Sequence, residues 1–245
     1  MKDTIFKLKE NKMIAKNTYL SVLSGDTSHI TASGQFVNIK LDGFYLRRPI
    51  SVCDVNGDEL TLIYKAVGSG TEAMAKTPAG AEWLVLTGLG NGYDLKKSGD
   101  RPLLIGGGAG VPPMYYLCKL LLAEGKKPTV ILGFGSRDEV FFKEEFEALG
   151  VKVYVTTVDG TEGIKGFVTD AMKDVDYTYF YTCGPEPMLK AIYKTSVTSG
   201  QFSFEERMGC GFGACMGCSC KVVTGYKRIC KDGPVLEKEE ILWQA

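Results

Sequence analysis

Residues 103–114 read Leu-Leu-Ile-Gly-Gly-Gly-Ala-Gly-Val-Pro-Pro-Met: an apolar run, a run of small residues and a pair of prolines. The apolar run is typical of a buried strand, and Pro112 or Pro113 suits the first turn of a helix. Glycines at such a junction let the backbone approach a phosphate, while the start of the helix supplies free N–H groups. The pattern therefore predicts a pyrophosphate-binding loop, with a merely tight turn as the alternative. The loop residues are Gly106, Gly107, Gly108, Ala109 and Gly110.

The same alternation of strand and helix continues downstream of this loop. Further apolar runs that suit buried strands cover residues 129–134, 151–156 and 177–181. Helical patterns cover residues 114–123, 140–149 and 188–193. Because helices between strands allow parallel pairing, we expect an α/β nucleotide-binding domain with a parallel sheet over residues 99–203.

Upstream of the loop the chain has a different character. Apolar and polar residues alternate at residues 37–41 and 60–64, and turns such as Asn56-Gly57-Asp58 separate the short segments. Short strands at close spacing, without a long amphipathic helix, predict an antiparallel β-barrel over residues 1–98. The polar stretch at residues 96–100 is the expected boundary between the two domains.

Charge and hydropathy limit the classes of partner. The 245 residues include 29 basic and 29 acidic side chains and no Lys/Arg-rich run. Without net charge the chain lacks the electrostatic attraction that dominates nucleic-acid affinity, so no nucleic-acid partner is expected. Its apolar runs are too short for a membrane span, and its charged first residues do not resemble a signal peptide. We therefore expect a cytoplasmic protein with no membrane partner.

The chain has eight cysteines and a single histidine, and these numbers limit the kinds of catalytic and metal sites that it can form. Because the cytosol keeps thiols reduced, the cysteines are expected to be metal ligands or redox groups rather than disulfides. The lone His29 excludes most hydrolytic triads and multi-histidine metal sites, and its polar neighbours predict a loop residue.

Four cysteines have the spacing Cys-x4-Cys-x2-Cys-x11-Cys: Cys210, Cys215, Cys218 and Cys230. The first three match the plant-type [2Fe-2S] loop, whose fourth ligand also lies further along the chain. Glycines between them permit the crowded backbone that such a loop requires. We therefore predict a small [2Fe-2S] subdomain at residues 204–245, with a structural zinc site as the alternative. Cys220 is expected to be a bystander rather than a substitute ligand.

Further motifs suit bound nucleotides. Cys183-Gly184-Pro185 follows the strand at 177–181, at the edge where open α/β sheets bind ligands, so Cys183 is either near a nicotinamide or simply a small buried residue. In the barrel, Arg48-Pro49-Ile50-Ser51 offers a cation for a phosphate and a hydroxyl, and Gly70-Thr71 opens a short helical stretch that suits a second anionic ligand. The alternative for Arg48 is an exposed charge without a ligand.

The three parts in this order resemble the ferredoxin-reductase superfamily, and the cysteine loop narrows the resemblance to electron-transfer subunits of class 1B dihydroorotate dehydrogenase. Motifs that look like FAD segments of that family are Arg48-Pro49-Ile50-Ser51, Ile63-Tyr64-Lys65 and Gly70-Thr71. Motifs that look like its nicotinamide-nucleotide segments are residues 106–114 and 183–188. The four spaced cysteines align with its cluster ligands, and Asp232-Gly233-Pro234-Val235 matches its usual closing motif.

The resemblance implies FAD, a [2Fe-2S] cluster and NAD as cofactors, and a catalytic partner that oxidises dihydroorotate at its own FMN. Electrons would pass from that FMN through the cluster and FAD to NAD+ in pyrimidine biosynthesis, within a heterotetramer containing two copies of each subunit. Ser51 and Cys183 would lie near the reacting edges of flavin and nicotinamide. Arg48 and Thr71 would hold the FAD pyrophosphate.

Two other functions stay open at this point. A reductase subunit of another complex, of ferredoxin:NADP oxidoreductase or sulfide dehydrogenase type, would contain the same modules, and a zinc-stabilised nucleotide-binding module would contain some of them. The choice between NAD and NADP is also open, because Ser136 and Arg137 suit a 2′-phosphate while Asp138 and Glu139 oppose it. The resemblance favours NAD.

Overall fold

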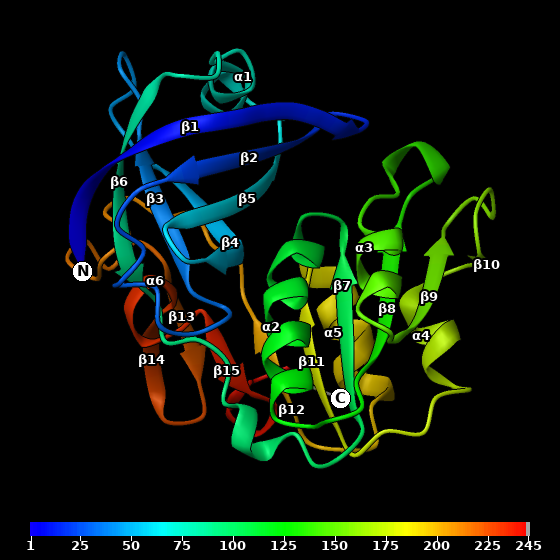
Figure 1. Ribbon diagram of the computed structural model, residues 1–245. Coiled ribbons are helices and arrows are strands. Elements are labelled where there is room, and N and C mark those ends of the chain that lie inside the picture. Colours follow the sequence, from blue (N-terminus) through cyan, green and yellow to red (C-terminus); the bar gives the residue numbers. More distant parts are fainter. Residues whose placement is uncertain (244–245) are drawn as a thin grey trace.

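A computed structural model describes residues 1–243, which form a β-barrel, an α/β domain and a small C-terminal subdomain (Figure 1). The barrel closes in the order β1-β2-β5-β4-β3-β6, with every neighbouring pair antiparallel. Its strands are β1 (Lys2–Ala15), β2 (Thr18–Ser24), β3 (Phe36–Lys40), β4 (Arg48–Asn56), β5 (Glu59–Lys65) and β6 (Glu82–Leu89). The predicted barrel is confirmed.

The alternating residues of the barrel fill its interior. Leu60 and Leu62 in β5 are fully buried, because successive residues of a strand point to opposite faces. Gly57, with φ of 59°, makes the tight turn between β4 and β5 in a backbone region that favours glycine. Helix α1 (Ser69–Ala75) lies over one end of the barrel (Figure 1), where the Asn11 amide donates to the Met74 carbonyl at 2.8 Å.

The α/β domain is built on a seven-stranded sheet in the order β10-β9-β8-β7-β11-β12-β15. Its strands are β7 (Pro102–Gly107), β8 (Thr129–Phe134), β9 (Lys152–Thr157), β10 (Ile164–Lys165), β11 (Tyr179–Cys183), β12 (Gly200–Ser203) and β15 (Val235–Glu237). All pairs are parallel except β12 with β15. The strands predicted from apolar runs correspond to β7, β8, β9 and β11, so the parallel sheet is confirmed.

Helices cover both faces of this sheet, with α2 on one face and α5 on the other (Figure 1). The helices are α2 (Val111–Ala123), α3 (Lys143–Ala148), α4 (Val168–Met172) and α5 (Glu186–Thr195). Three were predicted, whereas α4 was not. Short 3-10 turns are η1 (Leu95–Lys97), η2 (Gly108–Gly110), η3 (Arg137–Glu139) and η4 (Lys238–Glu240).

The C-terminal part has little core of its own. It contains β13 (Ser219–Val222), β14 (Gly225–Arg228) and α6 (Ile229–Asp232). Val222 and Ile229 are buried in the same apolar cluster as Phe202 and Leu236 of the large sheet. The subdomain therefore depends on the α/β domain for burial of its apolar side chains, and residues 235–237 join the large sheet outright. The domain boundaries at residues 98 and 203 stay a prediction.

Barrel and α/β domain are joined by α2, which packs against β4. The Lys119 ammonium in α2 contacts both carboxylate oxygens of Asp54 in β4 at 2.7 Å. A second bond joins the Lys65 ammonium in β5 to Glu139 at 3.0 Å. None of the helices within residues 1–243 has the length and apolar character that crossing a bilayer requires.

Candidate functional site

One cavity of about 470 Å³ lies where the barrel meets the α/β domain and the start of the cysteine loop. It brings together most of the residues that the sequence motifs singled out. Those that line it are Arg48, Pro49, Ile50, Ser51, Ile63, Tyr64, Lys65, Thr71, Gly107, Ala109, Gly110, Cys183, Gly184 and Pro185. Gly70, Gly106 and Gly108 are not among its lining residues.

Gly70 still shapes the cavity, because it leaves room for Arg48. A Cβ built on Gly70 would lie 1.9 Å from Arg48 Nε, so only glycine allows the guanidinium to rest against the start of α1. The same guanidinium lies over the Phe44 ring, 4.9 Å from its centroid. Arg48 is thus held beside the cavity rather than extended into solvent.

Thr71 fixes the turn that precedes α1. Its hydroxyl oxygen accepts hydrogen bonds from the N–H groups of Val67 and Gly68 at 3.1 and 3.2 Å, and the hydroxyl donates to the Gly68 carbonyl at 3.0 Å. A phosphate near Thr71 would therefore meet a turn that is already ordered.

Tyr64 and Lys65 line the cavity but direct their polar ends elsewhere. The Tyr64 hydroxyl donates to the Asn11 side-chain oxygen at 3.2 Å, and burial raises the pKa of Tyr64 to about 12. The Lys65 ammonium contacts Glu139 of the α/β domain. In this arrangement Lys65 helps to join the domains across the cavity.

On the α/β side, glycines let two loops touch. A Cβ on Gly110 would lie 2.1 Å from the Cys183 carbonyl oxygen, and one on Gly107 would lie 2.4 Å from Met188 Sδ. A Cβ on Gly106 would lie 2.8 Å from the Val111 Cα, so strand β7 and helix α2 meet without intervening side-chain volume. The glycine loop and the Cys183 turn therefore pack directly against each other at the wall of the cavity.

Cys183 lies at the end of β11 and is largely buried. Burial raises the pKa of its thiol to about 12, so the neutral thiol is the form present near neutral pH. It can act there as a small apolar group or a weak hydrogen-bond donor, but not as a thiolate nucleophile.

Several cavity residues were not predicted as site residues from the sequence, although Pro234 belongs to the closing motif. They are Phe36, Val67, Ser203, Phe204, Glu205, Glu206, Met208 and Pro234. Ser203 is the last residue of β12, and the cavity residues from Phe204 to Met208 follow it. Strand β12 has four residues and no clear sequence signal, so its end was not recognised as part of the ligand-facing edge. The rule that ligands bind at the carboxyl ends of parallel strands would have found them once β12 was known.

The cysteine loop adjoins this cavity. Cys210 is two residues beyond the cavity residue Met208, so their Cα atoms lie within about 7 Å of each other. Pro234, four residues after Cys230, lines the same cavity. Both ends of the loop therefore return to the cavity wall.

The four spaced cysteines form two pairs. The N–H groups of Cys210 and Cys215 each approach the other residue's sulfur at 3.4 Å, and the Cys230 N–H approaches Cys218 Sγ at 3.4 Å. Burial favours a protonated Cys210 thiol, but hydrogen bonds from backbone N–H groups, including that of Ala214 at 3.2 Å, outweigh it and lower the pKa of Cys210 to about 6. Such donors stabilise thiolate sulfur.

These donors fit a [2Fe-2S] cluster, in which each iron takes two thiolates. The pairing of Cys210 with Cys215 and of Cys218 with Cys230 places two thiols on each side, as two irons require. The loop also provides left-handed backbone at Gly211 and Gly213, with φ of 77° and 93°.

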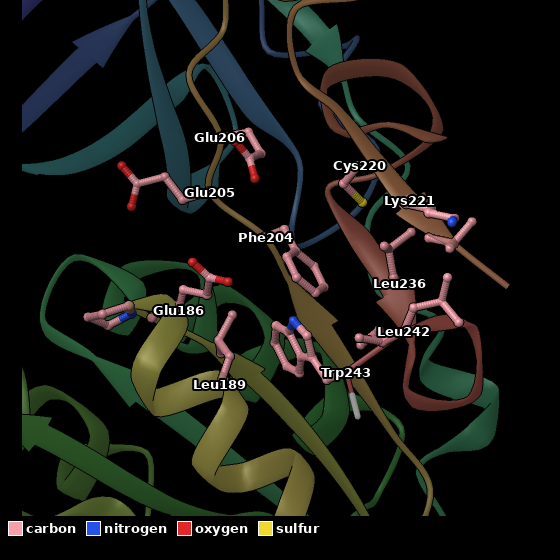
Figure 2. Close-up of a pocket in the computed structure, with 14 residues that line it drawn as sticks. Glu186, Leu189, Phe204, Glu205, Glu206, Cys220, Lys221, Leu236, Leu242 and Trp243 are labelled. Carbon is pink, nitrogen blue, oxygen red and sulfur yellow. The ribbon is translucent and has the colours of Figure 1, made fainter. Parts of the chain in front are cut away.

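A second, smaller cavity of about 330 Å³ is lined by residues 204–206 together with parts of α5, β13 and the chain end (Figure 2). Phe204 and Trp243 pack there with ring centroids 5.4 Å apart. Glu186, Glu205 and Glu206 lie on one side of this cavity, and Cys220 and Lys221 lie on the other (Figure 2). Cys220 lines this cavity, whereas none of the four spaced cysteines does, and its role as a bystander stays a prediction.

Comparison with protein families matches two parts of the chain. A family model described as the iron-sulfur cluster binding domain of dihydroorotate dehydrogenase B matches residues 205–242. A model described as the oxidoreductase NAD-binding domain matches residues 104–194.

Close relatives extend the match to nearly the full chain. The dihydroorotate dehydrogenase B (NAD(+)) electron transfer subunit of Geobacillus sp. (strain WCH70) is 43% identical over an alignment of 256 residues, gaps included. The alignment covers 99% of this chain and 99% of that one. The corresponding subunit of Bacillus mycoides (strain KBAB4) is 45% identical over 249 residues, covering 94% and 95% of the two chains.

Solved structures share the same architecture. A chain of the NADH-dependent reduced ferredoxin-NADP oxidoreductase superposes with a TM-score of 0.88 at 28% identity, covering 97% of this chain and 90% of that one. A ferredoxin NADP+ reductase from Neisseria gonorrhoeae with bound FAD and NADP superposes with a TM-score of 0.69 at 19% identity, covering 80% and 90%. The second similarity shows the fold alone.

Proposed function

Because this chain belongs to the family of dihydroorotate dehydrogenase B electron transfer subunits, we propose that it passes electrons from the FMN of a catalytic partner subunit to NAD+, as part of pyrimidine biosynthesis. It uses a [2Fe-2S] cluster and FAD as its own cofactors. When bound, FAD supplies the step that accepts electrons singly and returns them in pairs as a hydride. The protein's residues position these groups.

The observation that carries this proposal is the single cavity bordered by all three parts of the chain. Arg48 supplies a held cation for the FAD pyrophosphate, beside the ordered turn of Thr71. Ser51 offers a hydroxyl to the flavin edge, while Ile50 and Ile63 provide apolar contact. This assignment divides the cavity into a phosphate end and a ring end.

The nucleotide side of the cavity binds NAD in this proposal. The glycine loop presents backbone N–H groups at the start of α2 to its pyrophosphate. Cys183, kept neutral by burial, packs beside the nicotinamide without reacting with it. The close contact between Gly110 and the Cys183 carbonyl keeps the pyrophosphate end and the nicotinamide end at a fixed separation.

Cys210, Cys215, Cys218 and Cys230 hold the cluster in this proposal. Cys215 is exposed, while Cys218 and Cys230 are buried, so the Cys215 side is open to the catalytic partner. The other side faces the cavity through Met208 and Pro234. Electrons therefore have an entry side and an exit side.

The assembly is a heterotetramer with two copies of each subunit, located in the cytoplasm. A reducing compartment suits a chain whose eight cysteines are all free thiols within the described residues. We propose NAD+ as the electron acceptor, because the names of two relatives of this chain include NAD(+).

The test uses the full chain, purified without oxygen, alone and with its FMN-containing partner. Alone, it should contain FAD, iron and acid-labile sulfide and should reduce ferricyanide with NADH, without oxidising dihydroorotate. With the partner, dihydroorotate should reduce NAD+. Dihydroorotate turnover by the isolated chain would contradict the division of labour, and a colourless protein with stoichiometric zinc would overturn the cofactor assignment. Faster turnover with reduced ferredoxin and NADP+ would assign the chain to the other reductase type.

A further inference from the structure

The segment that follows β8 lies beside the phosphate loop. Strands β7 and β8 are parallel neighbours, with Gly107 opposite Gly133, so the loops that follow them leave the same edge of the sheet. Ser136 and Arg137 lie at that edge. In nucleotide-binding α/β folds this position meets the adenosine ribose, and an arginine there accommodates a 2′-phosphate.

The two acidic residues of this segment turn toward the barrel. Asp138 contacts the Lys16 ammonium at 2.8 Å, and Glu139 contacts the Lys65 ammonium at 3.0 Å. Asp138 also accepts a hydrogen bond from the Ser136 hydroxyl. Each of these two carboxylates is therefore paired with a cation of the barrel, and neither contacts Arg137.

A different carboxylate faces Arg137. Glu162, in the connection from β9 to β10, accepts a hydrogen bond from Arg137 Nε on its Oε2 atom at 2.9 Å, and Arg137 Nη2 forms an ion pair with the same oxygen at 2.9 Å. Its other oxygen lies 3.9 Å from the Lys143 ammonium at the start of α3. The connection and the turn after β8 lie at the same end of the sheet (Figure 1). Glu162 thus occupies a position between two cations.

Glu162 is held there by its backbone. The buried Thr157 hydroxyl donates to the Glu162 carbonyl at 2.7 Å and accepts from the Glu162 N–H at 3.1 Å. In addition, the Arg137 N–H donates to the Thr161 hydroxyl oxygen at 2.9 Å. The Glu162 side chain is 24% exposed, while that of Arg137 is 74% exposed, so the glutamate is the fixed partner and the arginine the movable one.

We propose that Glu162 is a specificity-determining residue that disfavours NADP by engaging Arg137. A 2′-phosphate would have to displace the carboxylate from Arg137 and would meet its negative charge beside Lys143. A ribose 2′-hydroxyl meets neither obstacle. This inference deepens the proposed function, on which it rests, by assigning the choice of nicotinamide nucleotide to one side chain outside the glycine loop.

The experiment compares the full chain with its Glu162→Gln variant in calorimetric titrations with 5′-AMP and 2′,5′-ADP, which differ by the 2′-phosphate. The expected result is a rise of about threefold or more in the affinity for 2′,5′-ADP relative to 5′-AMP, a size suited to a partly exposed ion pair. The ratio of NADPH to NADH efficiency with ferricyanide should rise in the same direction. Adding Arg137→Ala to the variant should cancel the gain.

Glu59→Gln is the matched control, because it removes a comparable ion pair, with Lys9 at 2.8 Å, on the barrel. It should leave the affinity ratio unchanged. An unchanged ratio in Glu162→Gln, or a gain that survives Arg137→Ala, overturns the inference. Failure of the proposed function gives a different result, in which the unmodified chain reduces ferricyanide with neither NADH nor NADPH.

Discussion

Replacing Gly70 with alanine tests the position of Arg48 without altering any charged group. The new Cβ would lie 1.9 Å from Nε, 2.4 Å from Cζ and 2.5 Å from Nη2 of Arg48. Contacts between heavy atoms are favourable near 3.5 Å, so the guanidinium must move by roughly 1.5 Å. Because the obstacle is the far end of a flexible side chain, the chain should fold and Arg48 should leave the cavity wall.

The size of the effect follows from the bond that is lost. A hydrogen bond to a charged group contributes about 1.5–3 kcal/mol, and each 1.4 kcal/mol is tenfold in affinity. Gly70→Ala should therefore weaken FAD binding by about 10- to 100-fold, measured by fluorescence titration of the FAD-free protein. The melting temperature of that FAD-free protein should stay level or rise, because alanine is the better helix former by up to about 1 kcal/mol.

Gly68→Ala is the control, since a Cβ there meets nothing within 4 Å and lies two residues away in the same turn. Its FAD affinity should change by less than about threefold, as expected for an exposed substitution. The losses of FAD affinity in Gly70→Ala and Arg48→Ala should not add in the double variant, because both changes remove the same interaction of Arg48 with FAD. Unchanged FAD affinity in Gly70→Ala, or equal losses in both glycine variants, would refute the role given to Arg48.

Three further outcomes follow from the structure. Cys215→Ser should lose iron and acid-labile sulfide while retaining FAD, whereas Cys220→Ser should retain all three; cluster content that survives the first change contradicts the ligand assignment. Asp54→Asn should lower the free energy of unfolding by about 1–2 kcal/mol, because it leaves the partly buried Lys119 ammonium without its carboxylate; an unchanged urea midpoint would argue against this contact. Burial raises the pKa of Cys183 to about 12, so between about pH 9 and 12 the unfolded chain releases a proton that the folded chain keeps, and stability should fall as pH rises; a urea midpoint that increases over this range has the wrong sign.

Strands and helices whose residue pattern extends over the whole element could be predicted from the sequence. The apolar run at residues 129–134 coincides with β8, because a strand buried on both faces must be apolar throughout. The glycine loop could be predicted because close approach of the backbone to a phosphate favours glycine. The cluster loop could be predicted because thiolate ligation of iron requires cysteine at set spacings.

Short strands and helices that depend on contacts with distant parts of the chain could not be predicted from the sequence. Strand β12 is four residues long and exists because it pairs with β11 and β15, while α4 is a five-residue helix. Charge partners were equally hidden, since Asp138 and Glu139 find their lysines in the barrel more than 70 residues away in the chain. Tertiary pairing decides such features, and local composition carries no trace of it.

The antiparallel contact between β12 and β15 has a consequence for how this chain is assembled. Ser203 pairs with Val235, and the Phe204 N–H donates to the Pro234 carbonyl at 2.9 Å, so the residues on either side of the cluster subdomain are already neighbours. Topologically, the iron-sulfur module takes the place of a hairpin tip. A tight reverse turn would reconnect the two strands, but the module is not an independent unit, because its removal would uncover Phe202 and Leu236 of the large sheet.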